Sequence, residues 1–169
     1  GFLAMITMAS PTFWFLAAFA NPFVFLGQLC LNAGVRKFLG MKPEIRRGVL
    51  LFSVFLAFYL YFILIDNSIL GRGIVVGFFS CLIAFIIAFT LFRGGKGRVS
   101  LAARFTGCVF LVFGLLLAAV TVMTCVLPPI RFYREFSEVL ARSIVFLLPI
   151  PGSILWTFGF VIMVNQRLN

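Results

Sequence analysis

The chain has 169 residues, of which 63% are hydrophobic and only 11% are charged. Its mean hydropathy is +1.20, so the composition excludes an ordinary soluble domain and indicates an integral membrane protein. The formal charge of +10 lies in short clusters between apolar stretches, which is the pattern of membrane topology, and we therefore expect no nucleic-acid partner.

The apolar stretches are about as long as the ~20 residues that cross a bilayer, and they lack the alternation of barrel strands. We therefore predict an all-α integral membrane protein, a bundle of five complete transmembrane helices plus a possible N-terminal partial helix. Residues 1–12 are the end of an earlier helix or an interfacial lead-in, and residues 13–164 form the transmembrane helical bundle. In chain order, the first four predicted spans cover about 11–35, 48–65, 72–92 and 101–127. An amphipathic stretch (130–142) follows outside, and the fifth span continues from it to about Val164.

Basic residues alternate between rich and poor connections along the chain. Segment 36–47 carries five Lys or Arg and segment 93–104 carries four, whereas 66–72 carries one and 128–134 carries two. Because Lys and Arg stay on the cytoplasmic side, the two rich segments are predicted to be cytoplasmic. The 13–35 helix then has its N-terminus outside, and the chain has a cytoplasmic C-terminus.

The fifth predicted span contains Pro149, Pro151 and Gly152. Each proline removes a backbone hydrogen bond, so we expect a kink or local unwinding near the outer end of this helix. The run 154–164 should then be a continuous rod to the cytoplasmic surface. This weak point has two interpretations. Either it converts a binding event at the outer face into movement of the helix, or it is a proline kink that neighbouring helices tolerate.

The chain has few side chains that could act in catalysis. The chain has no histidine and only four carboxylates, so we expect no catalytic residue, no metal ligand set and no cofactor, and hence no enzyme within these residues. The four cysteines fall inside apolar runs without a C-x-x-C motif, and they are predicted to be small buried apolar side chains.

Polar side chains within the spans are the first candidate ligand-binding residues. Asn21, Gln28 and Asn32 have spacings of seven and four, which places them on roughly one face of the first helix. Polar groups are costly inside a bilayer, so this face either lines a polar pocket or makes interhelical hydrogen bonds.

A second group of candidates lies at the predicted outer rim and comprises Asp66, Arg72, Arg131 and Arg134. These residues are either a solvated rim or a ligand-binding mouth. Arg72 has no topological reason to be outside, and it begins a helix whose N-terminal dipole is already positive. We therefore expect it to pair with Asp66 or to contact an anionic group.

Two further patterns concern packing. The third span carries a stripe of small residues, which predicts that this helix lies either centrally in the bundle or at a dimer contact. Aromatic side chains are predicted to be lipid-facing or interfacial filling. The stripe comprises Gly73, Gly77, Ser80, Ala84 and Ala88, and the aromatic set includes Trp14, Tyr59, Tyr61, Tyr133 and Trp156.

Four segments carry a family resemblance that covers about residues 13–169. "ANPFVFLGQLCLNAGVRKFLG" (20–40), "GRGIVVGFF" (71–79), "RFYREF" (131–136) and "WTFGFVIMVNQRLN" (156–169) resemble the multi-pass membrane sensor regions of bacterial GGDEF diguanylate cyclases and membrane sensor kinases. The closing run is the most specific segment. Neither a GG(D/E)EF sequence nor a kinase core is present in the chain, so the output domain of that family is absent here.

The resemblance implies a sensory input module in the bacterial inner membrane. Residues 165–169 would start a cytoplasmic signalling helix, and Asn165 and Arg167 would join Pro149, Pro151 and Gly152 in signal transmission. The stimulus would be a small-molecule or lipid ligand, membrane lipid would surround the bundle, and the full-length protein would be a homodimer whose output is most often a diguanylate cyclase. The alternative is a small transport, channel or scaffold subunit of a membrane complex.

Overall fold

The computed structural model describes residues 11–66, 68–94, 100–126 and 149–168, and every regular element within them is an α-helix. The all-α prediction is confirmed for this part of the chain. By length and composition, Ile45–Leu64, Leu70–Gly94 and Leu101–Val126 are apolar enough to cross a membrane. The helices are α2 (Pro11–Phe38), α3 (Ile45–Leu64), α4 (Ile69–Gly94), α5 (Ser100–Val126) and α7 (Pro149–Leu168).

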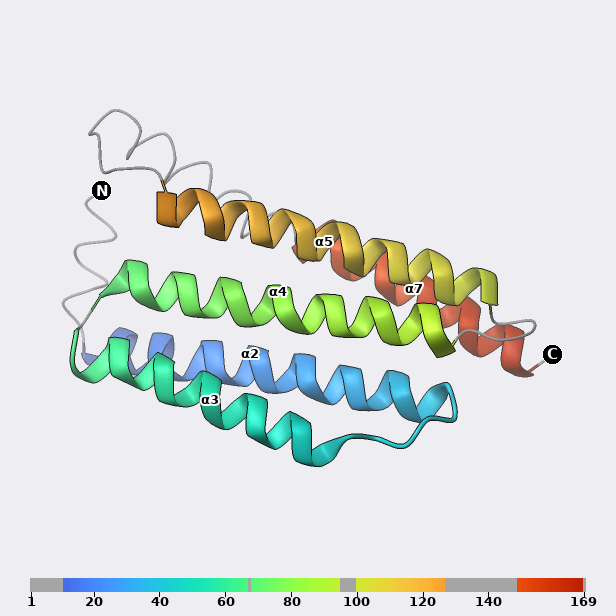
Figure 1. Cartoon of the computed structure of the whole chain (residues 1–169), viewed down its shortest axis with the longest axis horizontal. Coiled ribbons are helices and arrows are strands. Elements are labelled where there is room, and N and C mark those ends of the chain that lie inside the picture. Colours follow the sequence, from blue (N-terminus) through green and yellow to red (C-terminus); the bar gives the residue numbers. More distant parts are fainter. Residues whose placement is uncertain (1–10, 67, 95–99, 127–148, 169) are drawn as a thin grey trace.

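The helices lie side by side with α4 in the middle of the bundle (Figure 1). Helices α2 and α3 pack on one side of α4, α5 packs on the other, and α7 packs on α5. In the most apolar stretch of α4, half of the residues are buried, against 17% in the corresponding stretch of α3 and 11% in that of α5. The prediction of a central third span is therefore confirmed. Helices α2, α4 and α7 run in one direction, and α3 and α5 run in the other (Figure 1).

Aromatic rings form the junction of α2, α3 and α4. The ring centroids of Phe25 and Phe55 are 4.5 Å apart, and Phe79 meets both rings edge-on. Tyr59 stacks on Phe55 at 5.4 Å and is fully buried. The expectation of lipid-facing aromatic side chains is therefore wrong for Tyr59 but holds for Tyr61, which is exposed. Phenylalanine here supplies the core as well as the lipid-facing surface.

Small residues bring the central helices close together. A side chain at Gly77 of α4 would collide with Thr121 of α5, and a Cβ at Gly114 would lie 3.4 Å from that of Ala84. Gly73 is the exception in the stripe, because nothing lies near it. The backbones of α4 and α5 therefore come close together at Gly77 and Ala84 of the predicted stripe.

The connection between α2 and α3 is shorter than predicted, since helix continues to Phe38 and resumes at Ile45. Gly40 has φ 75°, which is easy only for glycine, and it closes α2 with bonds from its own N–H to Lys37 and from the Met41 N–H to Arg36. Glu44 accepts ion pairs from Arg36 and Arg47, each at 2.6 Å. This loop is therefore fixed at both ends.

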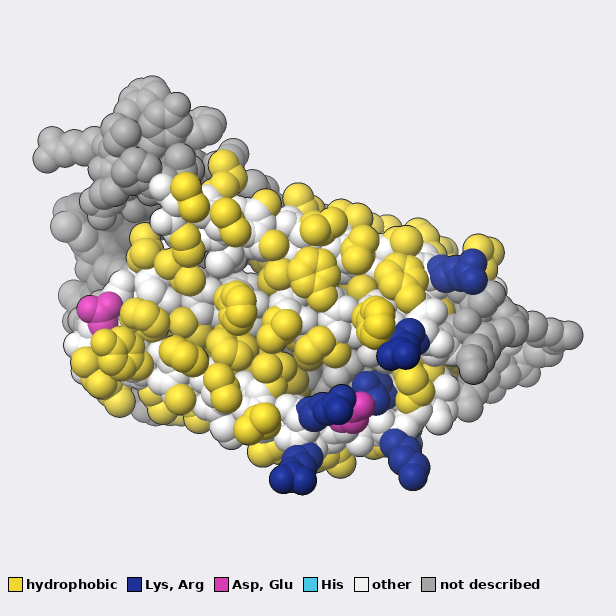
Figure 2. Space-filling model, in the orientation of Figure 1, with side chains coloured by type: hydrophobic (Ala, Val, Ile, Leu, Met, Phe, Trp, Pro, Cys, Tyr) yellow, Lys and Arg dark blue, Asp and Glu magenta, His cyan; other side chains and the backbone are white. Residues whose placement is uncertain are grey.

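Basic side chains gather at one end of the bundle, as Figure 2 shows for one face. Among the described residues, Arg72 in the first turn of α4 is the only Lys or Arg at the other end. The rest lie in the α2–α3 loop or near helix ends that share the same end of the bundle. They are Arg36, Lys37, Lys42, Arg46, Arg47, Arg93, Arg104 and, in the last turn of α7, Arg167.

The described part of helix α7 covers Pro149–Leu168, and the part of the predicted fifth span before Pro149 lies outside the described residues. Pro149, Pro151 and Gly152 form the first described turn of α7, so the kink expected there stays a prediction. The continuous rod over 154–164 is confirmed and extends to Leu168.

The cysteine prediction is only partly right. Cys81 is buried and its thiol lies 3.3 Å from the Gly114 carbonyl oxygen as a donor, whereas Cys30, Cys108 and Cys125 are exposed. All four are free thiols. In a lipid environment, an apolar side chain is about as stable on the surface of a helix bundle as in its interior. Hydrophobicity alone therefore does not predict which cysteines are buried.

Candidate ligand-binding groove

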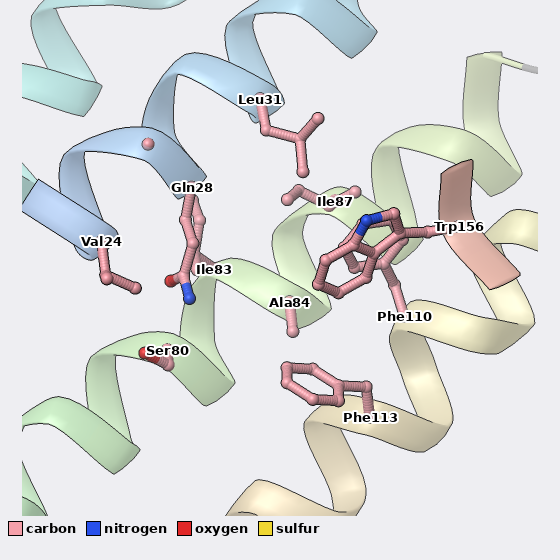
Figure 3. Close-up of a pocket in the computed structure, with 11 residues that line it drawn as sticks. Val24, Gln28, Leu31, Ser80, Ile83, Ala84, Ile87, Phe110, Phe113 and Trp156 are labelled. Carbon is pink, nitrogen blue, oxygen red and sulfur yellow. The ribbon is translucent and has the colours of Figure 1, made fainter. Parts of the chain in front are cut away.

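A cavity of about 500 Å³ lies where α2, α4, α5 and α7 meet. Figure 3 shows its side chains converging from these four helices. The volume falls within the range of small-molecule sites, ~300–1,000 Å³. The lining residues are Val24, Gly27, Gln28 and Leu31 of α2, Ser80, Ile83, Ala84 and Ile87 of α4, Phe110 and Phe113 of α5, and Trp156 of α7.

Gln28 is the principal polar group of this cavity. Its side chain extends from α2 toward Ser80 and Ala84 of α4 (Figure 3). The Gln28 Oε1 atom is buried, and it has no hydrogen-bond partner among the described residues. Ser80 is also buried. An unsatisfied buried polar atom costs roughly 1–3 kcal/mol, so an amide left in this state is a candidate ligand contact.

Aromatic rings form the opposite wall. The Trp156 indole stacks on Phe110 with centroids 5.1 Å apart and planes 6° apart, and Phe113 meets the indole edge-on at 5.8 Å. Below this pair, Gly159 of α7 sits against Thr106 of α5, whose hydroxyl donates to the Ala102 carbonyl at 2.8 Å. Glycine thus lets α7 approach α5 closely enough to hold the indole in place.

A second cavity of about 570 Å³ shares Leu31 and Trp156 with the first. The two cavities therefore adjoin, and we call them together the α2–α7 groove. Along α7 it runs from Trp156 to Asn165, a rise of about 14 Å at 1.5 Å per residue. It leads toward the end of the bundle where the basic residues gather. The other residues of the second cavity are Thr157, Phe160, Val161 and Val164.

The structure divides the predicted polar face of the first helix. The Asn21 amide donates to the Tyr59 hydroxyl at 2.9 Å, so this residue joins α2 to α3. Gln28 lines the groove instead. Asn32 is half-buried one turn further on, and its Oδ1 atom is buried with no partner among the described residues. The interhelical hydrogen bond is therefore confirmed for Asn21, whereas Gln28 lines a cavity that is mostly apolar.

At the predicted outer rim, the expected pair does not form. The Arg72 Nε donates to the Ser68 carbonyl at 3.2 Å, and Ser68 also caps α4 by accepting the Gly71 N–H at 3.0 Å. Asp66 is exposed, and no ion pair joins it to Arg72. The Arg72 guanidinium therefore contacts the N-terminal end of its own helix. Arg131 and Arg134 lie outside the described residues.

The predicted transmission residues occupy both ends of α7. Pro149, Pro151 and Gly152 form its first turn, and Arg167 lies in its last. Asn165 lines the groove, and the adjacent Gln166 has a buried Oε1 atom without a partner in the described chain. Gln28 and Asn165 therefore line the groove at different places, one in each cavity, and the described outer-rim candidates Asp66 and Arg72 line neither cavity.

Sequence reasoning missed Trp156, which was expected to be interfacial filling. A usable signal was present, since Trp156 and Phe160 are four residues apart and Phe110 and Phe113 are three apart, spacings that place each pair on one helix face. Among the described residues, no group of three potential metal ligands exists. No protein-family model matches the chain, nor does any curated protein or solved structure.

Proposed function

We propose that the chain is the sensory input module of a bacterial inner-membrane protein. It crosses the membrane five times, with the N-terminus of α2 outside and the C-terminus cytoplasmic, and it passes a signal through α7 to a cytoplasmic output domain. A diguanylate cyclase is the favoured output and a histidine kinase the second choice, because the segments named above resemble the sensor regions of those proteins. The chain itself catalyses no reaction.

The position of α7 is the observation that carries this proposal. One stretch of the helix walls the groove, and the same helix continues without a break to Leu168 at the basic end. A ligand in the groove would contact the element that leads out of the bundle. A shift of α7 at Trp156 would therefore reach its C-terminal turn as tilt, rotation or sliding.

The packing supports movement of α7 as a unit. Its described contacts are mainly with α5, through Gly159 against Thr106 and Trp156 on Phe110, whereas α4 is held by α2, α3 and α5. A ligand that binds one position of α7 more tightly shifts the equilibrium by that difference in affinity, typically about 1–3 kcal/mol. In a homodimer, two such helices would set the register of a following coiled coil.

Topology is tested by cysteine labelling in a variant whose four native cysteines are replaced by alanine. Lys42→Cys should react with an impermeant maleimide only after the cells are opened, whereas Asp66→Cys should react in intact cells. Both positions are exposed, so the comparison reports location. Strong labelling of the Lys42 position in intact cells would contradict the proposed orientation.

The function is tested in the full-length protein that contains this chain. The open reading frame after Asn169 should encode a cytosolic catalytic domain, and a stop codon there would favour the alternative of a transport, channel or scaffold subunit. Trp156→Ala should change the basal output, measured as cyclic di-GMP synthesis or autophosphorylation. Phe158→Ala is the matched control, because Phe158 is exposed on the same helix and lines neither cavity. Equal outputs from both variants and the wild type would reject transmission through α7.

A further inference from the structure

We propose that the α2–α7 groove binds a neutral, single-chain amphiphile taken from the bilayer, whose hydroxyl or carbonyl group hydrogen-bonds to the Gln28 amide. Its chain lies along Trp156, Phe160 and Val164. This names the ligand class of the sensory site, so its signalling consequence rests on the proposed function, whereas the binding itself does not.

The ligand is neutral because no described residue that lines either cavity is charged. Among the described lining residues, the polar side chains are Gln28, Ser80, Thr157 and Asn165, all of them uncharged. A charged group in this apolar space would lose its hydration without gaining an ion pair, which is costly in the interior of a membrane bundle. Charged headgroups are therefore poor occupants of the deep part of the groove.

The ligand carries a hydrogen-bonding group because Gln28 needs one. Its buried Oε1 atom has no partner among the described residues, although the amide of Asn21 on the same helix is satisfied by Tyr59. A hydroxyl could donate to this oxygen, and a carbonyl could accept from the amide nitrogen after the side chain turns over. A plain hydrocarbon chain would leave the amide unsatisfied.

The bilayer is the source because the rims of the groove are apolar and exposed. Val24 on the α2 side is 58% exposed, and Val161 on the α7 side is 59% exposed. In a membrane these rims face lipid, so a chain could enter sideways without passing a polar barrier. The apolar length of about 14 Å along α7 suits an extended alkyl chain.

Gly27 provides a way to close the groove. It lines the first cavity, and a Cβ built on it meets no atom within 4 Å, so Gly27→Leu would fill the cavity without displacing a neighbour. Gly34 lies two turns further along α2, is equally open, and lines neither cavity. Gly34→Leu is therefore a matched control for helix propensity and added bulk.

The test uses the quenching of Trp156 fluorescence in phosphatidylcholine vesicles. Trp14→Phe leaves Trp156 as the sole tryptophan, since the chain contains two. The probe is ω-bromododecanol, and bromododecane is the matched probe without a hydroxyl. We expect saturable quenching by the alcohol and only weak, non-saturable quenching by the bromoalkane, which merely partitions into the bilayer.

Three variants in this background sharpen the result. Gly27→Leu should abolish saturable quenching, and Gly34→Leu should leave it unchanged. Gln28→Leu should weaken binding of the alcohol about threefold to tenfold, the effect of one hydrogen bond in a membrane protein. The proposal is overturned if Gly27→Leu quenches like the Gly34→Leu control, or if the bromoalkane binds as tightly as the alcohol. Neither result bears on the output of the full-length Trp156→Ala variant, which tests the proposed function separately.

Discussion

Helix α2 presents two neighbouring faces that differ completely in packing. Phe25 is 2% exposed and lies between Phe55 and Phe79, so this face is filled by interlocking rings. Its neighbours Val24 and Gln28 belong to the face that opens on the groove. One helix thus contributes both to a close-packed aromatic junction and to a cavity.

The difference follows from what each face meets. At the junction, large rings from three helices fill the space between backbones. At the groove, Gly27 contributes no side chain, and Ser80 and Ala84 opposite it are small, so the gap between α2 and α7 remains.

Phe55→Ala should destabilise the bundle by about 3–5 kcal/mol, because it removes a fully buried ring and leaves a cavity. Phe58→Ala, one turn further along α3, should change stability by under about 0.5 kcal/mol, because Phe58 is exposed. The measurement is reversible unfolding in mixed micelles with increasing sodium dodecyl sulfate. Similar losses for both variants would show that the aromatic junction is not the core of the bundle.

Gly77→Leu should cost about 1–3 kcal/mol, because the new side chain collides with Thr121 and forces α4 and α5 apart. Gly73→Leu, one turn earlier, should be close to neutral, since nothing lies near that position. The same unfolding assay compares the two. If Gly73→Leu is the more damaging variant, the small-residue stripe packs differently from the arrangement described above.

Tyr59→Phe should cost about 0.6–1.7 kcal/mol by removing the hydroxyl that accepts the Asn21 amide. Tyr61→Phe is the control, because Tyr61 is exposed on the same helix. Thermal unfolding followed by circular dichroism is sensitive enough to separate the two. If Tyr59→Phe has the same stability as the wild type, the aromatic rings alone stabilise the α2–α3 contact, and the Asn21 hydrogen bond does not contribute.

The smallest effect concerns the α2–α3 loop. Arg36→Gln should cost about 0.5–1 kcal/mol, since Arg36 pairs with Glu44 and also donates to the Lys42 carbonyl. Arg47→Gln should cost less, because the Arg47 side chain is 81% exposed and its pair with the same Glu44 is screened by salt. Unfolding at low and high ionic strength measures the difference. Equal losses at both salt concentrations would argue against an electrostatic role for these pairs.

Much of the fold could be predicted, because apolar length and basic clusters are local properties of the chain. The starts and ends of α3 and α5 fall within a few residues of the predicted spans, and the small-residue stripe correctly indicated a central α4. The α2–α3 connection was predicted too long, since α2 continues to Phe38 and α3 begins at Ile45. Helix ends depend on capping and on neighbours more than on hydropathy.

The candidate site was less accessible from sequence. The spacing of Asn21, Gln28 and Asn32 placed all three on one face, but it could not say which helix each would meet. Arg72 and Asp66 are close in sequence, and proximity suggested a pair. The Arg72 guanidinium instead donates to the Ser68 carbonyl at the start of its own helix and does not pair with Asp66.

The sequence by itself determined that the chain is helical and apolar, where its basic residues cluster, and which side chains are polar within apolar stretches. These are consequences of composition and of the 3.6-residue period, and they need no partner helix. Only the tertiary structure decided that Asn21 is satisfied by Tyr59 while Gln28 is not, and that Trp156 faces a groove. The physical reason is that hydrogen bonding and cavity formation depend on which faces of different helices meet, and in an apolar bundle many helix arrangements bury similar hydrophobic area.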